Sequence, residues 1–416
     1  MSAITAKASR KMKKYAVLTR EPRCFLGSFD FSWEQRKLGD IGETYTGLSG
    51  KTKADFGHGQ ARFVTYMNVF SNPISNPEMT EPIEIDPKQN EVEVGDVFFT
   101  TSSETPEEVG MSSVLLEKRG KTYLNSFCFG FRPSEIIDSY YLAYMLRSES
   151  ARDKIILLAQ GISRYNISKN KVMEIAVSLP SLDEQKLIGQ YFRQLDNLIT
   201  LHQRKFEKLT NVKKSMLEKM FPQNGSSYPE IRFKGFTDPW EQRKLGELGT
   251  ITTGSTPSTS IPDYYSDDGI VWVTPTDICE NITFESARKL SDLGQQVGRV
   301  VPKNTILVTC IASIGKNTML GNTGSFNQQI NGLTPNENEC DPYFLLTESA
   351  LWSAKMKSSA AAGTMQIVNR TEFSELKTWL PSLIEQQVIS DFFRQLDNLI
   401  TLHQRQLFCI QSRKFL

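Results

Sequence analysis

Histidine, paired cysteine and long apolar runs are all scarce in this sequence. Its 416 residues include only three histidines, and its six cysteines lie far apart with no CxxC pair. This spacing argues against a zinc site and against a disulfide framework, and it fits a reducing cytoplasm, where we expect the protein to work. No apolar run reaches the ~18 residues of a membrane span, and the first residues lack the apolar core of a signal peptide.

Net charge is almost absent as well, with 48 basic against 47 acidic side chains. A surface for nucleic acid would therefore have to be a local basic patch. The apolar share of 39% and the charged share of 23% are ordinary for a folded protein and exclude wholesale disorder. At roughly 100–200 residues per domain, the length predicts two to four domains.

The common catalytic motifs are missing too. GKNT at Gly315 to Thr318 lacks the glycine spacing of a phosphate-binding loop, and there is no GxGxxG after a strand, no HExxH and no GxSxG. With so few histidines, general acid–base catalysis would need carboxylates that no pattern singles out. The sequence therefore predicts a binding protein without a cofactor or metal of its own, rather than an enzyme.

What the sequence does contain is a long internal repeat. WEQRKLG begins at Trp33 and again at Trp240, and FRQLDNLITLHQR occupies Phe192 to Arg204 and again Phe393 to Arg405. The stretches between these markers hardly resemble each other. Solenoid repeats are only about 20–50 residues long, so this unit is a whole domain plus a helix. A duplication without functional meaning would not erase the middle segments and leave the flanks identical.

The second marker lies in an amphipathic segment that predicts a long helix. Apolar residues recur at alternating spacings of three and four from Ile188 to Met216. A helix over Asp183 to Phe221 would be roughly 58 Å long. Its duplicate is the obvious partner, so we expect an antiparallel pair in which two histidines set the register rather than bind metal. The predicted interface residues are Ile188, Leu195, Leu198, His202, Ile389, Leu396, Leu399 and His403.

The variable stretches predict mixed domains. Val92 to Thr101, Gly269 to Val273 and Pro302 to Cys310 have the pattern of strands, whereas Ser139 to Leu158 and Tyr343 to Met356 have helical periodicity. We predict an α+β protein in which two mixed α/β domains are joined by two long antiparallel helices in a pseudo-two-fold arrangement. The predicted segments are a basic N-terminal extension (1–28), a first domain (29–180), a central helix (181–222), a linker (223–236), a second domain (237–380) and a shortened C-terminal helix (381–416).

From about Phe29 to Arg405, this organisation resembles the DNA specificity subunit of type I restriction–modification systems. The resemblance rests on both WEQRKLG copies and on LPSLDEQKLIGQYFRQLDNLITLHQR with its near-copy LPSLIEQQVISDFFRQLDNLITLHQR. In the second domain, TTGSTPSTS, IVWVTPTDI, CIASIGK and FNQQI also look like the target-recognition domain of this family. The first domain matches these inner motifs poorly, as expected if it recognises a different sequence. The basic extension and the shortened last helix depart from the family pattern.

The resemblance implies a non-catalytic chain that supplies the sequence specificity of a larger complex. Each variable domain would bind one half of a bipartite double-stranded DNA site, and the helices would fix the gap between the halves. The helices would also dock two methyltransferase subunits, which use S-adenosylmethionine to methylate adenine N6. Motor–nuclease subunits, with ATP and magnesium, would cleave unmodified DNA. The helix length fits this role, since half-sites on one face of B-DNA recur about every 34–36 Å.

Direct readout needs Arg, Lys, Asn or Gln at base edges, with Ser, Thr or backbone N–H groups at phosphates. On these grounds the candidate DNA contacts are Thr46, Lys51, Lys53, Tyr66, Asn68, Ser102, Ser103, Arg164 and Tyr165 in the first domain, and Ser255, Thr256, Thr276, Ser313, Lys316, Gln328 and Gln366 in the second. For each of them a turn or solvated-surface role stays open. Two other hypotheses also stay open: a coiled-coil scaffold or adaptor that binds proteins, and a self-contained DNA-modifying enzyme.

Overall fold

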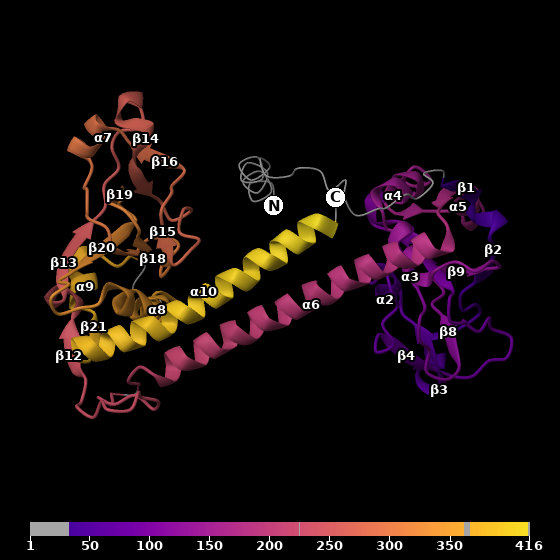
Figure 1. Ribbon diagram of the computed structural model, residues 1–416, viewed down its shortest axis with the longest axis horizontal. Coiled ribbons are helices and arrows are strands. Elements are labelled where there is room, and N and C mark those ends of the chain that lie inside the picture. Colours follow the sequence, from indigo (N-terminus) through magenta and orange to yellow (C-terminus); the bar gives the residue numbers. More distant parts are fainter. Residues whose placement is uncertain (1–32, 224, 362–366, 415–416) are drawn as a thin grey trace. The chain divides into compact units, whose positions relative to one another are not determined.

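The computed structural model describes residues 33–223, 225–361 and 367–414. The chain separates into two compact units, Met1–Asn197 and Leu198–Leu416, and the boundary falls inside one long helix. Each unit contains a domain of mixed helices and strands, which confirms the predicted α+β class (Figure 1). The predicted basic extension, residues 1–28, lies outside the described residues.

The first unit is built around a strand that is buried on both faces. Val97 and Phe99 of β5 belong to one apolar cluster and Phe98 belongs to another, as the period-two alternation of a strand requires. This is why the sequence there is an uninterrupted apolar run. The sheets are β2-β9-β5-β7 (Gly42–Thr46, Cys128–Pro133, Val97–Thr100, Ser112–Val114), β4-β3-β8 (Thr80–Ile83, Phe56–Val64, Thr122–Leu124), β1-β11 (Glu34–Lys37, Ala176–Leu179) and β6-β10 (Ser102–Ser103, Tyr165–Asn166). The helices are α2 (Tyr66–Ser71), α3 (Ser139–Met145), α4 (Glu149–Ile156) and α5 (Lys169–Met173).

The second unit repeats this plan with different residues. Ile306 and Val308 of β17 enter one apolar cluster and Leu307 enters another. The sheets are β13-β20-β17-β18-β15 (Gly249–Thr253, Ile330–Pro335, Ile306–Thr309, Asn317–Leu320, Ile282–Thr283), β16-β14-β19 (Arg288–Leu290, Tyr265–Val273, Gly324–Phe326) and β12-β21 (Glu241–Lys244, Lys377–Leu380). The helices are α7 (Asp292–Val297), α8 (Pro342–Ala361) and α9 (Arg370–Glu375).

The two domains therefore share one frame in spite of their unlike sequences. In each domain the EQRK residues of the WEQRKLG motif form a strand that pairs antiparallel with the strand before the long helix, β1 with β11 and β12 with β21. In each, a long strand pairs parallel with a short one, β3 with β8 and β14 with β19. The short turn that follows β8 and β19 leads directly into β9 and β20, strands of the larger sheet.

The predicted strands are all present, and one predicted helix is divided. Strands β5, β14 and β17 occupy the three segments expected to be strands, and α8 contains the segment Tyr343 to Met356. The segment Ser139 to Leu158 forms α3 and α4 instead of one helix. The reason is local, because the Ser148 hydroxyl accepts the N–H of Ala151 and starts a new helix there.

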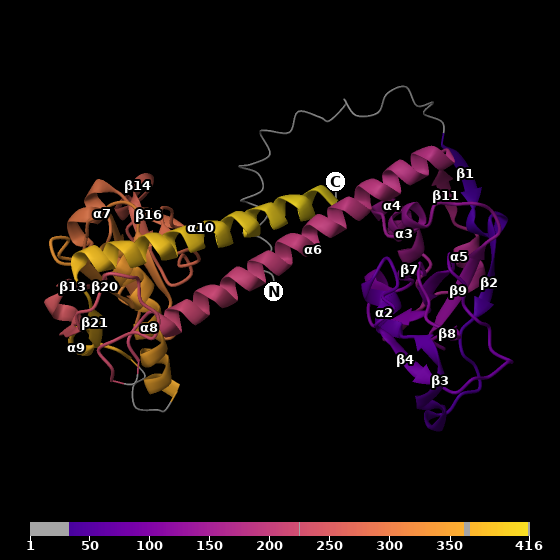
Figure 2. The ribbon, with the colours of Figure 1, turned by 60° about the horizontal axis from the view of Figure 1, so that its bottom comes forward.

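Two long helices carry the repeated marker, α6 (Leu182–Lys219) and α10 (Leu383–Lys414). In the second unit, the part of α6 from Leu198 onwards lies along α10 in both ribbon views (Figure 2). Nδ1 of His202 lies 2.9 Å from Nδ1 of His403, and Nζ of Lys213 lies 2.6 Å from Oδ1 of Asp397. Since residue numbers rise along α6 while those of their partners fall along α10, the two helices are antiparallel.

Part of the predicted interface between α6 and α10 is shifted by one residue along each helix. Leu198 and Leu399 are 42% and 46% exposed, so the prediction that they lie in the helix interface is wrong. Their neighbours Ile199 and Ile400 are half-buried instead. Adjacent apolar residues made the two registers equally consistent with the sequence. Of the other predicted interface positions, Leu195, Ile389 and Leu396 are buried, and Ile188, His202 and His403 are half-buried.

The end of α6 and the linker after it are packed into the second domain. Phe221 is 1% exposed, and its ring centroid lies 5.8 Å from that of Trp240 and 6.0 Å from that of Phe393. Just beyond, the guanidinium of Arg232 makes two hydrogen bonds, of 2.8 and 2.9 Å, with the carboxylate of Glu385 at the start of α10. The part of the linker around Arg232 is therefore packed on the folded domain.

Replacing Arg232 with alanine is expected to destabilise the second unit. Glu385 is 2% exposed at its side chain, so the substitution leaves a buried carboxylate without its cation, at a cost of about 3–5 kcal/mol. The measurement is urea unfolding followed by circular dichroism. Lys244→Ala is the control, because it breaks an exposed pair with Glu375 that contributes less than about 1 kcal/mol. Equal effects of the two substitutions would contradict the assignment.

A buried carboxyl makes the stability of the second domain depend on pH. Glu348 of α8 is 2% exposed; its Oε1 accepts the N–H of Trp379 at 3.1 Å, and its Oε2 has no hydrogen-bond partner in the described part of the chain. Burial raises the pKa of this carboxyl from 4.5 to about 7. The neutral carboxyl makes its full contribution to the unfolding free energy below pH 4.5. This contribution is lost as the pH rises through 7.

Glu348→Gln is therefore expected to stabilise the protein at high pH. The amide keeps the shape of the side chain and does not ionise, so the unfolding free energy of the variant should gain on that of the wild type as the pH rises. Between pH 5 and pH 8 the gain should amount to about 2.5 kcal/mol. Urea unfolding at a series of pH values measures it, with the exposed Glu337→Gln as control. A difference that stays constant with pH would contradict the prediction.

Candidate nucleic-acid interface

Four loops of the second domain meet at one edge of its sheets. The N–H of Cys310, in the loop after β17, donates to the carbonyl of Gln329, in the turn between β19 and β20. Nζ of Lys316 donates to the carbonyl of Pro275 at 3.1 Å, which joins the loop after β17 to the loop after β14. The hydroxyl of Thr256, in the loop after β13, donates to Oε1 of Gln328. Of the predicted contacts, this edge brings together Ser255, Thr256, Thr276, Ser313, Lys316 and Gln328.

These side chains form a polar, partly basic surface. Thr256, Thr276, Ser313, Lys316 and Gln328 are all exposed. Arg299 adds a second cation that the sequence did not single out. Its Nη1 donates to the carbonyl of Thr253 at 2.6 Å, and its backbone N–H donates to the hydroxyl of Ser255 at 3.0 Å. A guanidinium held in this way beside hydroxyl and amide groups suits a phosphate and the base edges next to it.

The first domain has the corresponding edge. The amide of Asn90 donates to the carbonyl of Thr46 at 3.1 Å, at the end of β2. The backbone N–H and the hydroxyl of Thr101 both donate to the carbonyl of Phe127, in the turn between β8 and β9. The hydroxyl of Tyr66 donates to the carbonyl of Ser102 at 2.6 Å. Thr46, Tyr66 and Tyr165 thus lie around this turn, together with the short strand pair β6-β10.

Three predicted contacts of the first domain are corrected by their burial. Asn68 is 0% exposed, and its amide donates to the carbonyls of Asn76 and Met79 at 2.7 and 3.0 Å, so it holds a loop and does not face DNA. Ser102 and Ser103 are 5% and 7% exposed because they pair with β10. Lys51 is committed to an ion pair with Asp86 at 2.9 Å, which raises the pKa of this lysine.

For the remaining candidates, a contact with DNA stays a prediction. Lys53 and Arg164 are exposed in the first domain, and Gln366 lies outside the described residues. Besides Arg299, sequence reasoning missed Phe127 and Gln329, which occupy matching turns of the two domains. No signal in a single sequence aligns those turns, because the aligned segments NSFC (125–128) and NQQI (327–330) share only the asparagine.

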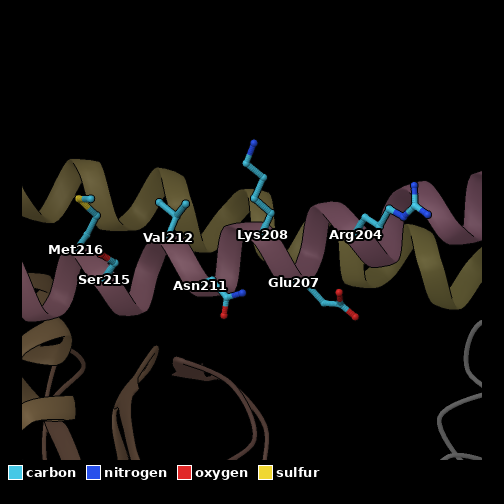
Figure 3. Close-up of a pocket in the computed structure, with 7 residues that line it drawn as sticks. All are labelled: Arg204, Glu207, Lys208, Asn211, Val212, Ser215 and Met216. Carbon is cyan, nitrogen blue, oxygen red and sulfur yellow. The ribbon is translucent and has the colours of Figure 1, made fainter.

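The described residues offer no obvious catalytic centre. A shallow hollow of about 510 Å³ lies along the part of α6 that belongs to the second unit. Among its lining residues, Figure 3 shows Lys208 extending from one side of α6 and Glu207 and Asn211 from the other. In the described ranges no group of His, Cys, Asp and Glu could hold a metal ion. Over the same ranges, no helix has the length and apolar character to cross a membrane.

Comparison with known proteins gives a consistent family. Residues 32–211 and 237–410 each match the type I restriction modification DNA specificity domain. The putative type I restriction enzyme MjaX specificity subunit of Methanocaldococcus jannaschii is 22% identical over 403 residues, which cover 94% of this chain and 92% of that protein. The type I restriction enzyme HindI specificity subunit of Haemophilus influenzae is 30% identical over 171 residues, which cover 39% and 37% respectively.

Solved structures show the same fold. The crystal structure of a type I restriction–modification S subunit from M. genitalium has a TM-score of 0.61 and 12% identity, and the match covers 94% of this chain and 96% of that one. A chain from a structural study of complex assembly and conformational transition of the type I system has a TM-score of 0.56 and 15% identity, with 94% and 97% covered. The curated relatives bear the names of specificity subunits, in agreement with the expectation of a non-catalytic chain. Because the two domain matches together cover most of the sequence, the chain belongs to the family of DNA specificity subunits of type I restriction–modification systems.

Proposed function

We propose that this protein selects the DNA sequence on which a type I restriction–modification complex acts. Each domain binds one half of a bipartite double-stranded site through the loop edge described above, and the pair of long helices sets the gap between the halves. Methyltransferase subunits dock on these helices and bring S-adenosylmethionine. Motor–nuclease subunits bring ATP and magnesium, and the complex works in the cytoplasm.

The observation that carries this proposal is the repeated frame with unlike edges. Four strands of the larger sheet follow the same order in both domains, β2-β9-β5-β7 and β13-β20-β17-β18, and both domains gather hydroxyl and amide groups at the same edge of that frame. The second domain adds Lys316 and Arg299 there. Different side chains on one frame are what an asymmetric, interrupted site requires, since base contacts specify sequence and phosphate contacts position the protein.

The helices support the rest of the proposal. They repeat the same residues, whereas the domains do not, so a surface on them can serve the same kind of partner twice. Within the second unit, α6 also carries a shallow hollow in which Arg204 and Lys208 are followed, at four-residue spacing, by Val212 and Met216, and this lining suits a protein surface better than a small ligand. Of these four residues, only Arg204 belongs to the repeated stretch.

A substitution at Lys316 tests the DNA edge of the second domain. Lys316→Ala removes an exposed cation, so it should weaken binding of all sequences to a similar degree and reduce the slope of log K against log salt concentration by about 1. Fluorescence anisotropy of the assembled complex at several salt concentrations measures both effects. Lys303→Ala is the control, because Lys303 is equally exposed but lies before β17, at the opposite end of that strand. An unchanged slope for both variants would remove this edge from the interface.

An insertion tests the role of the helices. Four extra residues at matching positions of α6 and α10 lengthen each helix by about 6 Å, so the preferred gap should widen by at most about two base pairs while both half-sites stay the same. Sequencing of methylated sites in cells that carry the altered gene measures the gap. The same insertion after Gly120, in an exposed turn, should leave it unchanged. A gap that ignores the helix insertion would contradict the proposal.

A further inference from the structure

The turn between β8 and β9 of the first domain has an atomic counterpart between β19 and β20 of the second. In the first, the N–H of Phe127 donates to Oδ1 of Asn125 at 2.8 Å, and the N–H of Cys128 donates to the carbonyl of Asn125 at 3.1 Å. In the second, the N–H of Gln329 donates to Oδ1 of Asn327 at 3.1 Å, and the N–H of Ile330 donates to the carbonyl of Asn327, also at 3.1 Å. The same asparagine turn is thus built twice.

The surroundings of the two turns match as well. The N–H of Asn125 donates to the last residue of β3, Val64, and that of Asn327 donates to the last residue of β14, Val273. A glycine presses against each turn: a Cβ at Gly47 would overlap the carbonyl of Asn125, and a Cβ at Gly254 would overlap the carbonyl of Asn327. Each turn is therefore held on both sides by backbone, so its tip has a fixed position at the loop edge.

Only the tips differ. The first turn carries Ser126 and Phe127, and the Phe127 ring is 56% exposed although it is a large apolar group. The second carries Gln328 and Gln329. The hydroxyl of Thr256 donates to Oε1 of Gln328, and the amide of Asn327 donates to Oε1 of Gln329 at 3.1 Å. With both side-chain oxygens engaged, the amide N–H groups are the atoms with which the two glutamines can bind a ligand.

We propose that these tips are specificity-determining positions, with Gln328 and Gln329 donating hydrogen bonds to base acceptors and Phe127 contacting a thymine methyl group. The inference rests on the proposed function, because it assigns which residues read bases at the loop edge. Purine N7, guanine O6 and thymine O4 are the acceptors that amide N–H groups can reach in the major groove. The thymine methyl group is the apolar feature there, and a ring that water does not cover suits it.

The two tips are also interchangeable on structural grounds. The bonds that form the turn use backbone atoms and the asparagine, so none of them depends on the tip side chains. Exchange of the tip residues between the two turns should therefore change the side chains that face DNA without changing the backbone of either turn.

The experiment exchanges the tips in the assembled methyltransferase complex and measures the preferred site by selection from random DNA. Gln328→Ser with Gln329→Phe should change the preferred bases at one or two positions of the second half-site, by roughly tenfold or more, and leave the first half-site as it was. Ser126→Gln with Phe127→Gln should do the reverse. Replacing thymine with uracil in the first half-site, which removes only the methyl group, should weaken the wild type and not the Phe127→Gln variant.

A matched control and a milder variant keep the test decisive. Asn338→Ala lies in another asparagine turn, in which the N–H of Asn338 donates to Asn336 at the far end of β20, and it should change no base preference. If the double exchange lowers the melting temperature, Gln328→Glu takes its place; a carboxylate should shift the preference towards adenine or cytosine, whose amino groups donate. Unchanged preferences in variants that still bind selectively would overturn the inference alone. Uracil-insensitive wild-type binding would overturn the methyl contact. A wild type without any sequence preference would overturn the proposed function.

Discussion

The stability of the second unit depends on the apolar contact between α10 and the end of α6. From Leu198 onwards α6 has an apolar stripe that must be buried, and within this unit α10 lies antiparallel along it. At the end of this contact, Phe221 packs in the domain core beside Trp240 and Phe393. Arg232 then forms hydrogen bonds with Glu385 at the start of α10. The domain, the linker and the two helices of this unit therefore share one core.

The tryptophan of the WEQRKLG motif has a different environment in the first domain. Trp240 is 2% exposed under Phe221, whereas its counterpart Trp33 is 42% exposed and donates its Nε1–H to Glu184 at 3.2 Å. Glu184 corresponds in the repeat to Glu385, which is held by Arg232. The leucines that follow each tryptophan, Leu38 and Leu245, are both 0% exposed. The shared residues thus determine the strand and the buried leucine. The environment of the tryptophan depends on the segments that pack against it.

The two domains keep one frame while the side chains at its turns differ, which is the arrangement that recognition of two unlike half-sites would require. The asparagine turns, the glycines beside them and the parallel strand pairs rely on backbone hydrogen bonds and close approach, which tolerate many neighbouring side chains. The hydrogen bonds that form each turn use the asparagine and backbone atoms, so the tip side chains can differ without loss of the turn. In the proposed mode of recognition, stability and specificity are carried by different atoms of the same turn.

The sequence by itself determined the duplication, the long helices, the α+β class and several strands, because these depend on local periodicity and on repeated letters. Only the tertiary structure decided which apolar column of α6 is buried, since Leu198 and Ile199 are adjacent and either fits a helical stripe. It also decided that Asn68, Ser102 and Ser103 lie inside, and that Phe127 and Gln329 lie at matching tips. Burial and register are set by contacts between segments far apart in the chain, and a single sequence does not contain that pairing.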